Sequence, residues 1–226
     1  MQTAALFDLD GVLVDTEAQY TAFWERTGRR DVPACPDFAN RIKGHTLREI
    51  FSSYYDGREA LQRQVEQELV QFEKEMHFPF IPGAMEFVQE LRKTSIPVAV
   101  VTSSNRDKMA CLYAAHPSFA DGFDRIFTAE DALRSKPAPD CYLAAASAFG
   151  LEAEHCFVFE DSLNGLRAAQ ASGAVVVGLS TGLPADIVRP YCNHVMPDFR
   201  HFSVDQMLAM LPEKNAEKCL FSMIID

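Results

Sequence analysis

Residues 3–13 read Thr-Ala-Ala-Leu-Phe-Asp-Leu-Asp-Gly-Val-Leu, an apolar run that ends in two aspartates separated by one residue. In an extended strand, side chains at i and i+2 share a face, so Asp8 and Asp10 can both face one crevice at the strand's carboxyl end. Carboxylates this close repel each other unless they share a divalent cation or a proton. An acidic turn with Gly11 at its corner is the alternative interpretation.

Further short apolar runs follow, with helical patterns between them, which is typical of a parallel sheet covered by helices on both faces. The runs that predict strands are 3–9, 97–102, 124–128, 155–160 and 174–179. Apolar residues recur at helical spacing over 84–91, and an alanine-rich stretch over 165–172 predicts a helix that ends at Gly173. The sequence therefore predicts an α/β core built on a doubly wound, Rossmann-like parallel sheet.

The segment 16–79 interrupts this alternation, because it contains no convincing strand run. Its main feature is an apolar stripe on a charged helix, made of Leu61, Val65, Leu69, Phe72 and Met76. Pro79 ends the helical stretch. We therefore expect a small all-helical domain at 16–79, inserted into a core domain that comprises 1–15 and 80–212, with a C-terminal tail at 213–226.

The chain has 226 residues, of which 32 are acidic and 21 basic, and its net charge is -11. Such a balance argues against nonspecific binding to nucleic acid or anionic membranes, so we expect neither as a partner. The 6 cysteines form no CxxC pair, which indicates neither a zinc site nor a disulfide framework. No leader-like apolar segment begins the chain and no run approaches the ~20 apolar residues of a membrane span, so we expect a cytoplasmic protein.

Polar groups also follow three of the later strands. Thr102 and Ser103 place hydroxyls and free backbone N–H groups at a strand end, where such groups can hold phosphate oxygens. Lys136 lies in a rigid Ser-Lys-Pro-Ala-Pro loop and can neutralise a phosphoryl group, although alone it would be a surface lysine. Glu160 and Asp161 close another apolar strand and offer the oxygen ligands that six-coordinate magnesium needs, while a helix N-cap at Asp161 is a compatible alternative.

Taken in order, Asp-Leu-Asp-Gly, a threonine after a buried strand, Lys-Pro and Glu-Asp-Ser resemble the four sequence motifs of the haloacid dehalogenase superfamily. The resemblance covers about 4–196. Within the superfamily, the chain resembles the β-phosphoglucomutase-like and phosphoglycolate-phosphatase-like branch. In that branch a helical cap follows the first motif, as the helical segment does here. The resemblance implies that Asp8 attacks phosphorus, and that Asp10 protonates the leaving group and then activates the water that hydrolyses the aspartyl phosphate.

The same resemblance assigns the remaining motif residues. It implies that Thr102 and Lys136 bind the transferring phosphoryl group. It also implies that Mg²⁺ is the cofactor, held by four residues: Asp8, Asp10 through its backbone carbonyl, Glu160 and Asp161. Because dehalogenase members of the superfamily use only the first aspartate, the presence of Asp10 argues against a haloacid substrate.

The helical segment also resembles the branch's specificity loop around Gly44, but with two departures. Leu47 falls where β-phosphoglucomutase has an arginine for the substrate's second phosphate, and Tyr20 falls where it has a histidine. Both changes count against a mutase, which is the alternative, and favour a phosphatase acting on a small phosphorylated metabolite of the sugar or polyol phosphate class. We expect the side chains that face the leaving group to be Glu17, Lys43, His45 and Thr46. We also expect a monomer or a weak homodimer.

Two further interpretations compete with this one. Residues 178–182 fit the G-x-S-x-G pattern of a serine-hydrolase nucleophile elbow, with Asp198 and His201 downstream, although Pro184 follows where a helix should begin. A non-catalytic phosphate-binding module on the same fold is the other alternative. It is opposed by the fact that every position of the chemistry implied above is filled.

Overall fold

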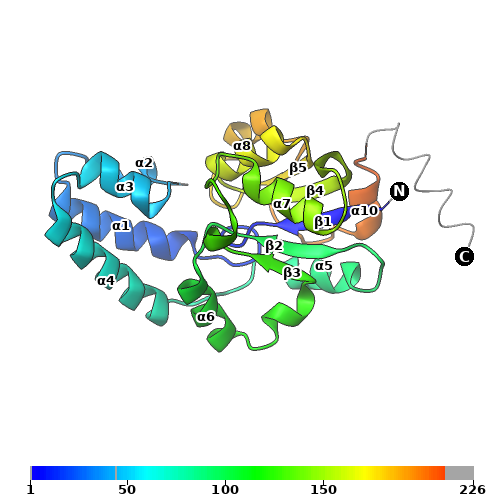
Figure 1. The fold of residues 1–226 in the computed structure, drawn as a ribbon, viewed down its shortest axis with the longest axis horizontal. Helices are drawn as coiled ribbons and strands as arrows, with labels where there is room; N and C mark the ends of the chain where they lie inside the picture. The colour runs from blue at the N-terminus through cyan, green and yellow to red at the C-terminus, as the bar shows by residue number, and fades with distance from the viewer. Residues whose placement is uncertain (1, 44, 212–226) are drawn as a thin grey trace, which may run out of the picture.

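The computed structural model describes residues 2–43 and 45–211, and within them it contains a six-stranded parallel sheet (Figure 1). The strand order is β3-β2-β1-β4-β5-β6. The strands are β1 (Ala4–Phe7), β2 (Val98–Val101), β3 (Arg125–Phe127), β4 (Cys156–Glu160), β5 (Val175–Leu179) and β6 (His194–Met196). The predicted doubly wound parallel sheet is therefore confirmed, and each of the five predicted runs contains a strand.

β6 is the strand that the sequence did not predict. It has only three residues, all of them half-buried, and it pairs with β5 at the edge of the sheet. An edge strand this short carries no apolar run, because it has only one neighbouring strand, which leaves its side chains partly in solvent.

Alternate residues of the central strands enter two separate cores. Phe7, Val98 and Val100 pack on the side covered by α5 (Ala84–Leu91), α6 (Arg106–Ala115) and α10 (Val204–Leu208). Leu6 and Val101 pack on the other side, which α7 (Asp140–Ala148), α8 (Leu163–Ser172) and α9 (Ala185–Val188) cover. Both faces of the sheet are thus buried, which is why its strands read as continuous apolar runs. Short 3-10 helices connect these elements: η1 (Phe119–Gly122), η2 (Ala129–Asp131), η3 (Ala153–His155) and η4 (Arg189–Tyr191).

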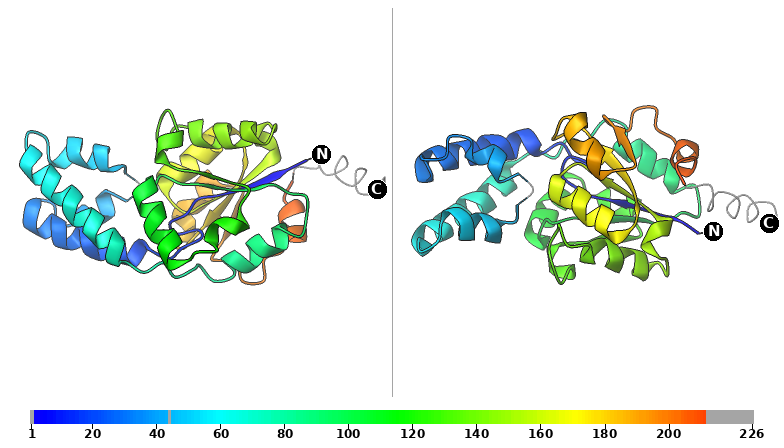
Figure 2. Two further views of the ribbon diagram at one scale, coloured as in Figure 1. Left: turned by 60° about the horizontal axis from the view of Figure 1, so that its bottom comes forward. Right: turned by 90° about the horizontal axis from the view of Figure 1, so that it is seen from above.

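The helices of the first third of the chain lie together beyond the carboxyl end of β1, as Figures 1 and 2 show. They are α1 (Glu17–Asp31), α2 (Phe38–Arg41), α3 (Leu47–Tyr54) and α4 (Glu59–Glu75). They share a core of their own, to which Phe23, Trp24 and Val65 contribute. The predicted helical region is confirmed, with Met76 of the predicted stripe lying just past the end of α4. The exact domain limits at 16 and 79 stay predictions, and the predicted tail at 213–226 lies outside the described residues.

Two chain segments connect the helical region to the sheet, and they are bonded to each other. The amide of Asp15 donates to the Pro79 carbonyl at 2.7 Å, and the amide of Ile81 donates to the Leu13 carbonyl at 2.9 Å. The side chain of Gln19 bonds both backbone groups of His77, at 2.7 and 2.9 Å. These contacts hold the start of α1 beside the end of α4, and so place the helical region over the carboxyl edge of the sheet.

Within the described residues, no helix is both long enough and apolar enough to cross a bilayer. The expectation of a cytoplasmic protein stays a prediction.

A cluster of phenylalanines supports the central strands, and it generates a stability prediction. Phe87 is 1% exposed, and its ring lies 6.1 Å from that of Phe7 and 5.7 Å from that of Phe159. We expect Phe87→Ala to lower the free energy of unfolding by about 3–5 kcal/mol, because the surrounding rings cannot close the cavity. Urea denaturation measures this loss. Leu143→Ala on the exposed side of α7, where Leu143 is 45% exposed, should change it by less than ~0.5 kcal/mol; equal losses would contradict the prediction.

Candidate functional site

The turn after β1 separates the two aspartates. The Asp8 amide still donates to the Phe159 carbonyl at 3.0 Å, as a strand residue would, but the amides of Leu13 and Val14 then fold back onto the Leu9 carbonyl. Gly11 adopts a φ of 75°, and a Cβ there would lie 2.1 Å from Oδ2 of Asp161. The chain therefore bends at Leu9 and turns over 11–13, so the regular strand β1 ends before Asp10.

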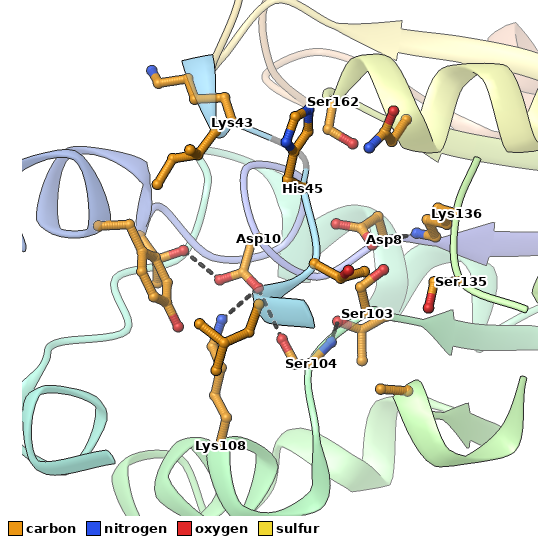
Figure 3. Close-up of a pocket in the computed structure, with 18 of the residues that line it drawn as sticks. Asp8, Asp10, Lys43, His45, Ser103, Ser104, Lys108, Ser135, Lys136 and Ser162 are labelled. Atoms are coloured by element: carbon orange, nitrogen blue, oxygen red, sulfur yellow. Dashed lines mark hydrogen bonds and ion pairs between the residues drawn. The ribbon is translucent and has the colours of Figure 1, made fainter. Parts of the chain in front are cut away.

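Asp8 and Asp10 line the same cavity, as the prediction of one shared crevice requires, but they have different hydrogen-bond partners. Asp8 accepts a hydrogen bond from Lys136, whereas Asp10 is bonded to Ser104 and Lys108 (Figure 3).

Lys136 is the central cation of the site. It is 6% exposed, and its Nζ lies 2.6 Å from Oδ1 of Asp8 and 2.7 Å from Oε1 of Glu160. It also donates to the Val101 carbonyl at 3.0 Å and lies 4.9 Å from the ring centre of Tyr142. The alternative of an ordinary surface lysine is thus wrong.

Three buried carboxylates meet beside Lys136. Oxygens of Asp8, Glu160 and Asp161 all lie within 4.8 Å of one another. Burial raises the pKa of Asp8, with Lys136 opposing the shift, and burial together with the charge of Glu160 raises the pKa of Asp161 well above its usual range. Three carboxylates whose oxygens converge in a buried site offer the hard oxygen ligands that a divalent cation binds, so this set fits such a cation.

Glu160 differs from the other two acids in that both of its oxygens accept hydrogen bonds from protein groups. Oε1 accepts from Lys136 and from the Tyr142 hydroxyl at 2.8 Å, and Oε2 accepts from the Asp161 amide at 3.0 Å. Gly165 leaves room for this carboxylate, because a Cβ there would lie 1.7 Å from Oε1. The next helix is capped by Ser162, whose side chain accepts from the Gly165 amide, so the N-cap alternative for Asp161 is wrong.

Asp10 is held by three donors that the sequence did not predict as partners. Oδ1 accepts from the Thr16 hydroxyl at 2.5 Å, and Oδ2 accepts from the Ser104 hydroxyl at 3.0 Å and from Nζ of Lys108 at 2.5 Å. Burial acts to raise the pKa of Asp10, but Lys108 and these hydrogen bonds lower it. The only sequence signal was the position of Ser104 beside the predicted Thr102 and Ser103.

Asp8, Asp10, Lys136 and Asp161 line one cavity of about 470 Å³ between the sheet and the helical region. The structure brings almost every predicted site residue to its wall, from both parts of the chain: Asp8, Asp10, Glu17, Lys43, His45, Thr46, Thr102, Ser103, Lys136 and Asp161. Glu160 lies behind this wall, bonded to Lys136. Of the helical residues, Glu17 has its pKa raised by burial, with Lys43 opposing the shift.

The helical wall of the cavity is partly apolar and partly committed to local structure. Trp24, Ile42 and Leu47 line it. Thr46 caps α3: its hydroxyl accepts from the Glu49 amide at 3.3 Å, and the Glu49 carboxylate accepts from the Thr46 amide. The predicted Thr46 is therefore at the site, but its hydroxyl already has a structural partner.

The serine-hydrolase alternative lacks its defining geometry. The pattern at 178–182 covers the end of β5 and the turn after it, and the next helix begins only at Ala185, after Pro184. The hydroxyl of Thr181 instead donates to the Gly11 carbonyl at 2.5 Å. This segment thus supports the turn that carries Asp10.

The fold and the site together define an α/β enzyme built around a buried aspartate, a lysine and a group of acids suited to a cation. Residues 2–173 match the model of the haloacid dehalogenase-like hydrolase family, so the chain belongs to this family. A family structure, the haloacid dehalogenase hydrolase of family IA, variant 3, from Entamoeba histolytica, superposes with a TM-score of 0.81 at 23% identity, covering 93% of this chain and 99% of that one.

Three relatives indicate the range of activities near this chain. Validoxylamine A 7'-phosphate phosphatase of Streptomyces hygroscopicus subsp. limoneus is 32% identical, covering 80% of this chain and 87% of that protein. Hexitol phosphatase A of Escherichia coli is 31% identical, covering 81% and 85%. Beta-phosphoglucomutase of Bacillus subtilis is 27% identical, covering 82% and 88%.

The acidic cluster generates a metal prediction. We expect saturating Mg²⁺ to raise the melting temperature by roughly 5–10 °C, since a cation bound only by the folded state relieves the repulsion among the buried acids. In Asp161→Asn this rise should be lost, whereas the exposed Asp186→Asn should keep it. Scanning calorimetry with and without Mg²⁺ measures both, and a full Mg²⁺ response in Asp161→Asn would exclude the cluster as the binding site.

Proposed function

We propose that the protein is a Mg²⁺-dependent phosphatase that hydrolyses a small phosphomonoester of the sugar or polyol phosphate class through an aspartyl phosphate. The observation that carries the proposal is the arrangement of Asp8, which opens onto the cavity while its other side is held by Lys136 at 2.6 Å. A carboxylate fixed in this way can attack phosphorus in line, because the lysine orients it and offsets the charge of the incoming phosphoryl group. The phosphatase relatives support the substrate class.

The reaction proceeds in two steps. Asp8 forms a bond to phosphorus while the bond between phosphorus and the ester oxygen breaks, and Asp10 gives its proton to the departing alcohol. Asp10 then accepts a proton from the water that attacks the aspartyl phosphate, which releases phosphate and restores Asp8. The separate donor sets of the two aspartates suit this division of labour, since Lys136 holds Asp8 while Thr16, Ser104 and Lys108 hold Asp10.

The phosphoryl group is held from the sheet side. Thr102, Ser103 and Lys136 line the cavity near Asp8 and are the proposed donors to its oxygens. Asp8, the backbone carbonyl of Asp10, Glu160 and Asp161 would hold Mg²⁺, which supplies positive charge for the phosphoryl oxygens. Since Glu160 already accepts bonds from Lys136 and Tyr142, it also fixes the position of Lys136.

The helical region acts as the proposed cap and meets the leaving group through Glu17, Lys43, His45 and Thr46. Leu47 lines the cavity where a mutase would need an arginine, and the Tyr20 hydroxyl donates to Glu73 at 2.8 Å. Neither residue offers a cation for a second phosphate, which favours a phosphatase over a phosphosugar mutase.

The nucleophile is tested by Asp8→Asn. We expect turnover to fall by ~10³ or more, because the amide cannot form the aspartyl ester, with a circular dichroism spectrum like that of the wild type. The exposed Asp186→Asn serves as the control and should keep full activity. Full residual activity in Asp8→Asn would refute the assignment.

The reaction type is tested by assaying Mg²⁺-dependent phosphate release from sugar phosphates, polyol phosphates, nucleotides and pyrophosphate, with isomerisation of β-glucose 1-phosphate assayed in parallel. We expect phosphate release from several small esters, because Leu47 and Tyr20 stand at the two cap positions where the resemblance places the mutase's arginine and histidine. Isomerisation without net phosphate release would identify a mutase instead.

A further inference from the structure

A buried lysine outside the family motifs contacts Asp10. Lys108, in the first turn of α6, is 4% exposed, although its helix follows a loop at the edge of the site. The Asn105 side chain caps this helix by accepting from the Lys108 amide at 2.9 Å. A buried ammonium is costly unless it is paired, and Lys108 finds its partner in Oδ2 of Asp10 at 2.5 Å.

Lys108 determines where the Asp10 carboxylate points. Thr16 holds one oxygen, and Ser104 and Lys108 hold the other, so removing Lys108 leaves Oδ2 with a single neutral donor at 3.0 Å. The three donors come from two segments, the N-terminus of α1 and the N-terminus of α6, and Asp10 is not a member of the cluster formed by Asp8, Glu160 and Asp161. Figure 3 shows Lys108 and Ser104 reaching Asp10 from below, while Asp8 lies to its right beside Lys136.

The same lysine also contacts the cap. Its Nζ lies 4.6 Å from the centre of the Tyr20 ring, and the Tyr20 hydroxyl donates to Glu73 at 2.8 Å. Tyr20 belongs to α1, Glu73 to α4 and Lys108 to α6, so the chain of contacts crosses from both long cap helices to the core. An ammonium over an aromatic face is attracted to it, so the Tyr20 ring helps to hold the ammonium of Lys108 in place.

We propose that Lys108 is a positioning residue that, supported by the Tyr20 ring of the cap, fixes the Asp10 carboxylate in the orientation needed for proton transfer to the leaving oxygen. The inference rests on the proposed function, in which Asp10 exchanges that proton. It adds a residue that acts through Asp10 and through a cap contact, without touching the phosphoryl group itself.

The test compares two leaving groups in Lys108→Met, which keeps the length of the side chain but removes the donor. The first substrate is the alkyl phosphate hydrolysed fastest in the substrate panel, with sorbitol 6-phosphate as first choice. Its kcat/KM should fall about 10- to 100-fold, because misplacing a proton donor slows departure of a basic alkoxide. For 4-nitrophenyl phosphate, kcat/KM should fall less than about 3-fold, since its weakly basic leaving group departs without a proton. A merely structural role would lower both values equally.

Variants at the same position and elsewhere separate the outcomes. Lys108→Arg keeps the charge and the donors, so it should recover most of the lost alkyl phosphate activity; Lys93→Met removes an exposed lysine and should change nothing. Tyr20→Phe, which keeps the ring, should discriminate between the substrates less than Tyr20→Leu. Melting temperatures within a few degrees of the wild type exclude unfolding as the cause. If Lys108→Met is unstable, Lys108→Arg still tests the inference. An arginine variant that loses both activities equally would overturn it.

Asp10→Asn distinguishes failure of this inference from failure of the proposed function. It should lose alkyl phosphate activity selectively, as Lys108→Met does but by a larger factor. If Asp10→Asn discriminates between the two esters and Lys108→Met does not, the positioning role is refuted while the proposed function stands. If Asp10→Asn lowers both values equally, the acid role of Asp10 fails, and the inference fails with it.

Discussion

The ion pairs of Lys136 connect the chemistry of this protein to its fold. The ammonium is buried and bonded to Asp8, Glu160 and the Val101 carbonyl, at distances between 2.6 and 3.0 Å. A buried charge is stable only when its partners are fixed in place. These partners stand at the carboxyl ends of β1, β4 and β2, three neighbouring strands, so the lysine requires the same strand order and register as the hydrophobic cores.

The register of the sheet shows how strict this requirement is. Phe7 pairs with Val100 on one side and with Phe159 on the other. The residues that follow these three, Asp8, Val101 and Glu160, therefore lie level with one another at the edge of the sheet. A slip by one residue would turn Phe7 out of its core and Asp8 into it, because alternate side chains face opposite sides. Core packing therefore places the acid and the lysine's other acceptors within reach of one another.

This coupling explains what the sequence could predict. Residues that directly follow buried strands, such as Asp8, Thr102 and Glu160, were found because the apolar run itself shows where the sheet edge lies. Thr16 and Lys108, which determine the orientation of Asp10, begin helices after loops, and their distance from Asp10 depends on tertiary packing. A lysine in a helix is also usually exposed, so the pattern around Lys108 gave no indication that its ammonium is buried. The half-buried β6 was missed for a related reason, since it carries no continuous apolar run.

The cap shows why the chemistry is easier to infer from sequence than the substrate. Several of its polar groups that line the cavity stabilise the cap or its contact with the core: the Thr46 hydroxyl closes a capping box, and the Tyr20 hydroxyl bonds Glu73. Such groups are costly to strip of their partners, so the Thr46 and Tyr20 hydroxyls keep these structural bonds even though both residues line the cavity. Leu47 adds an apolar side chain to the same wall. The leaving group must therefore be selected as much by the shape of the cavity as by hydrogen bonds, and shape arises from packing between helices, which no single motif encodes.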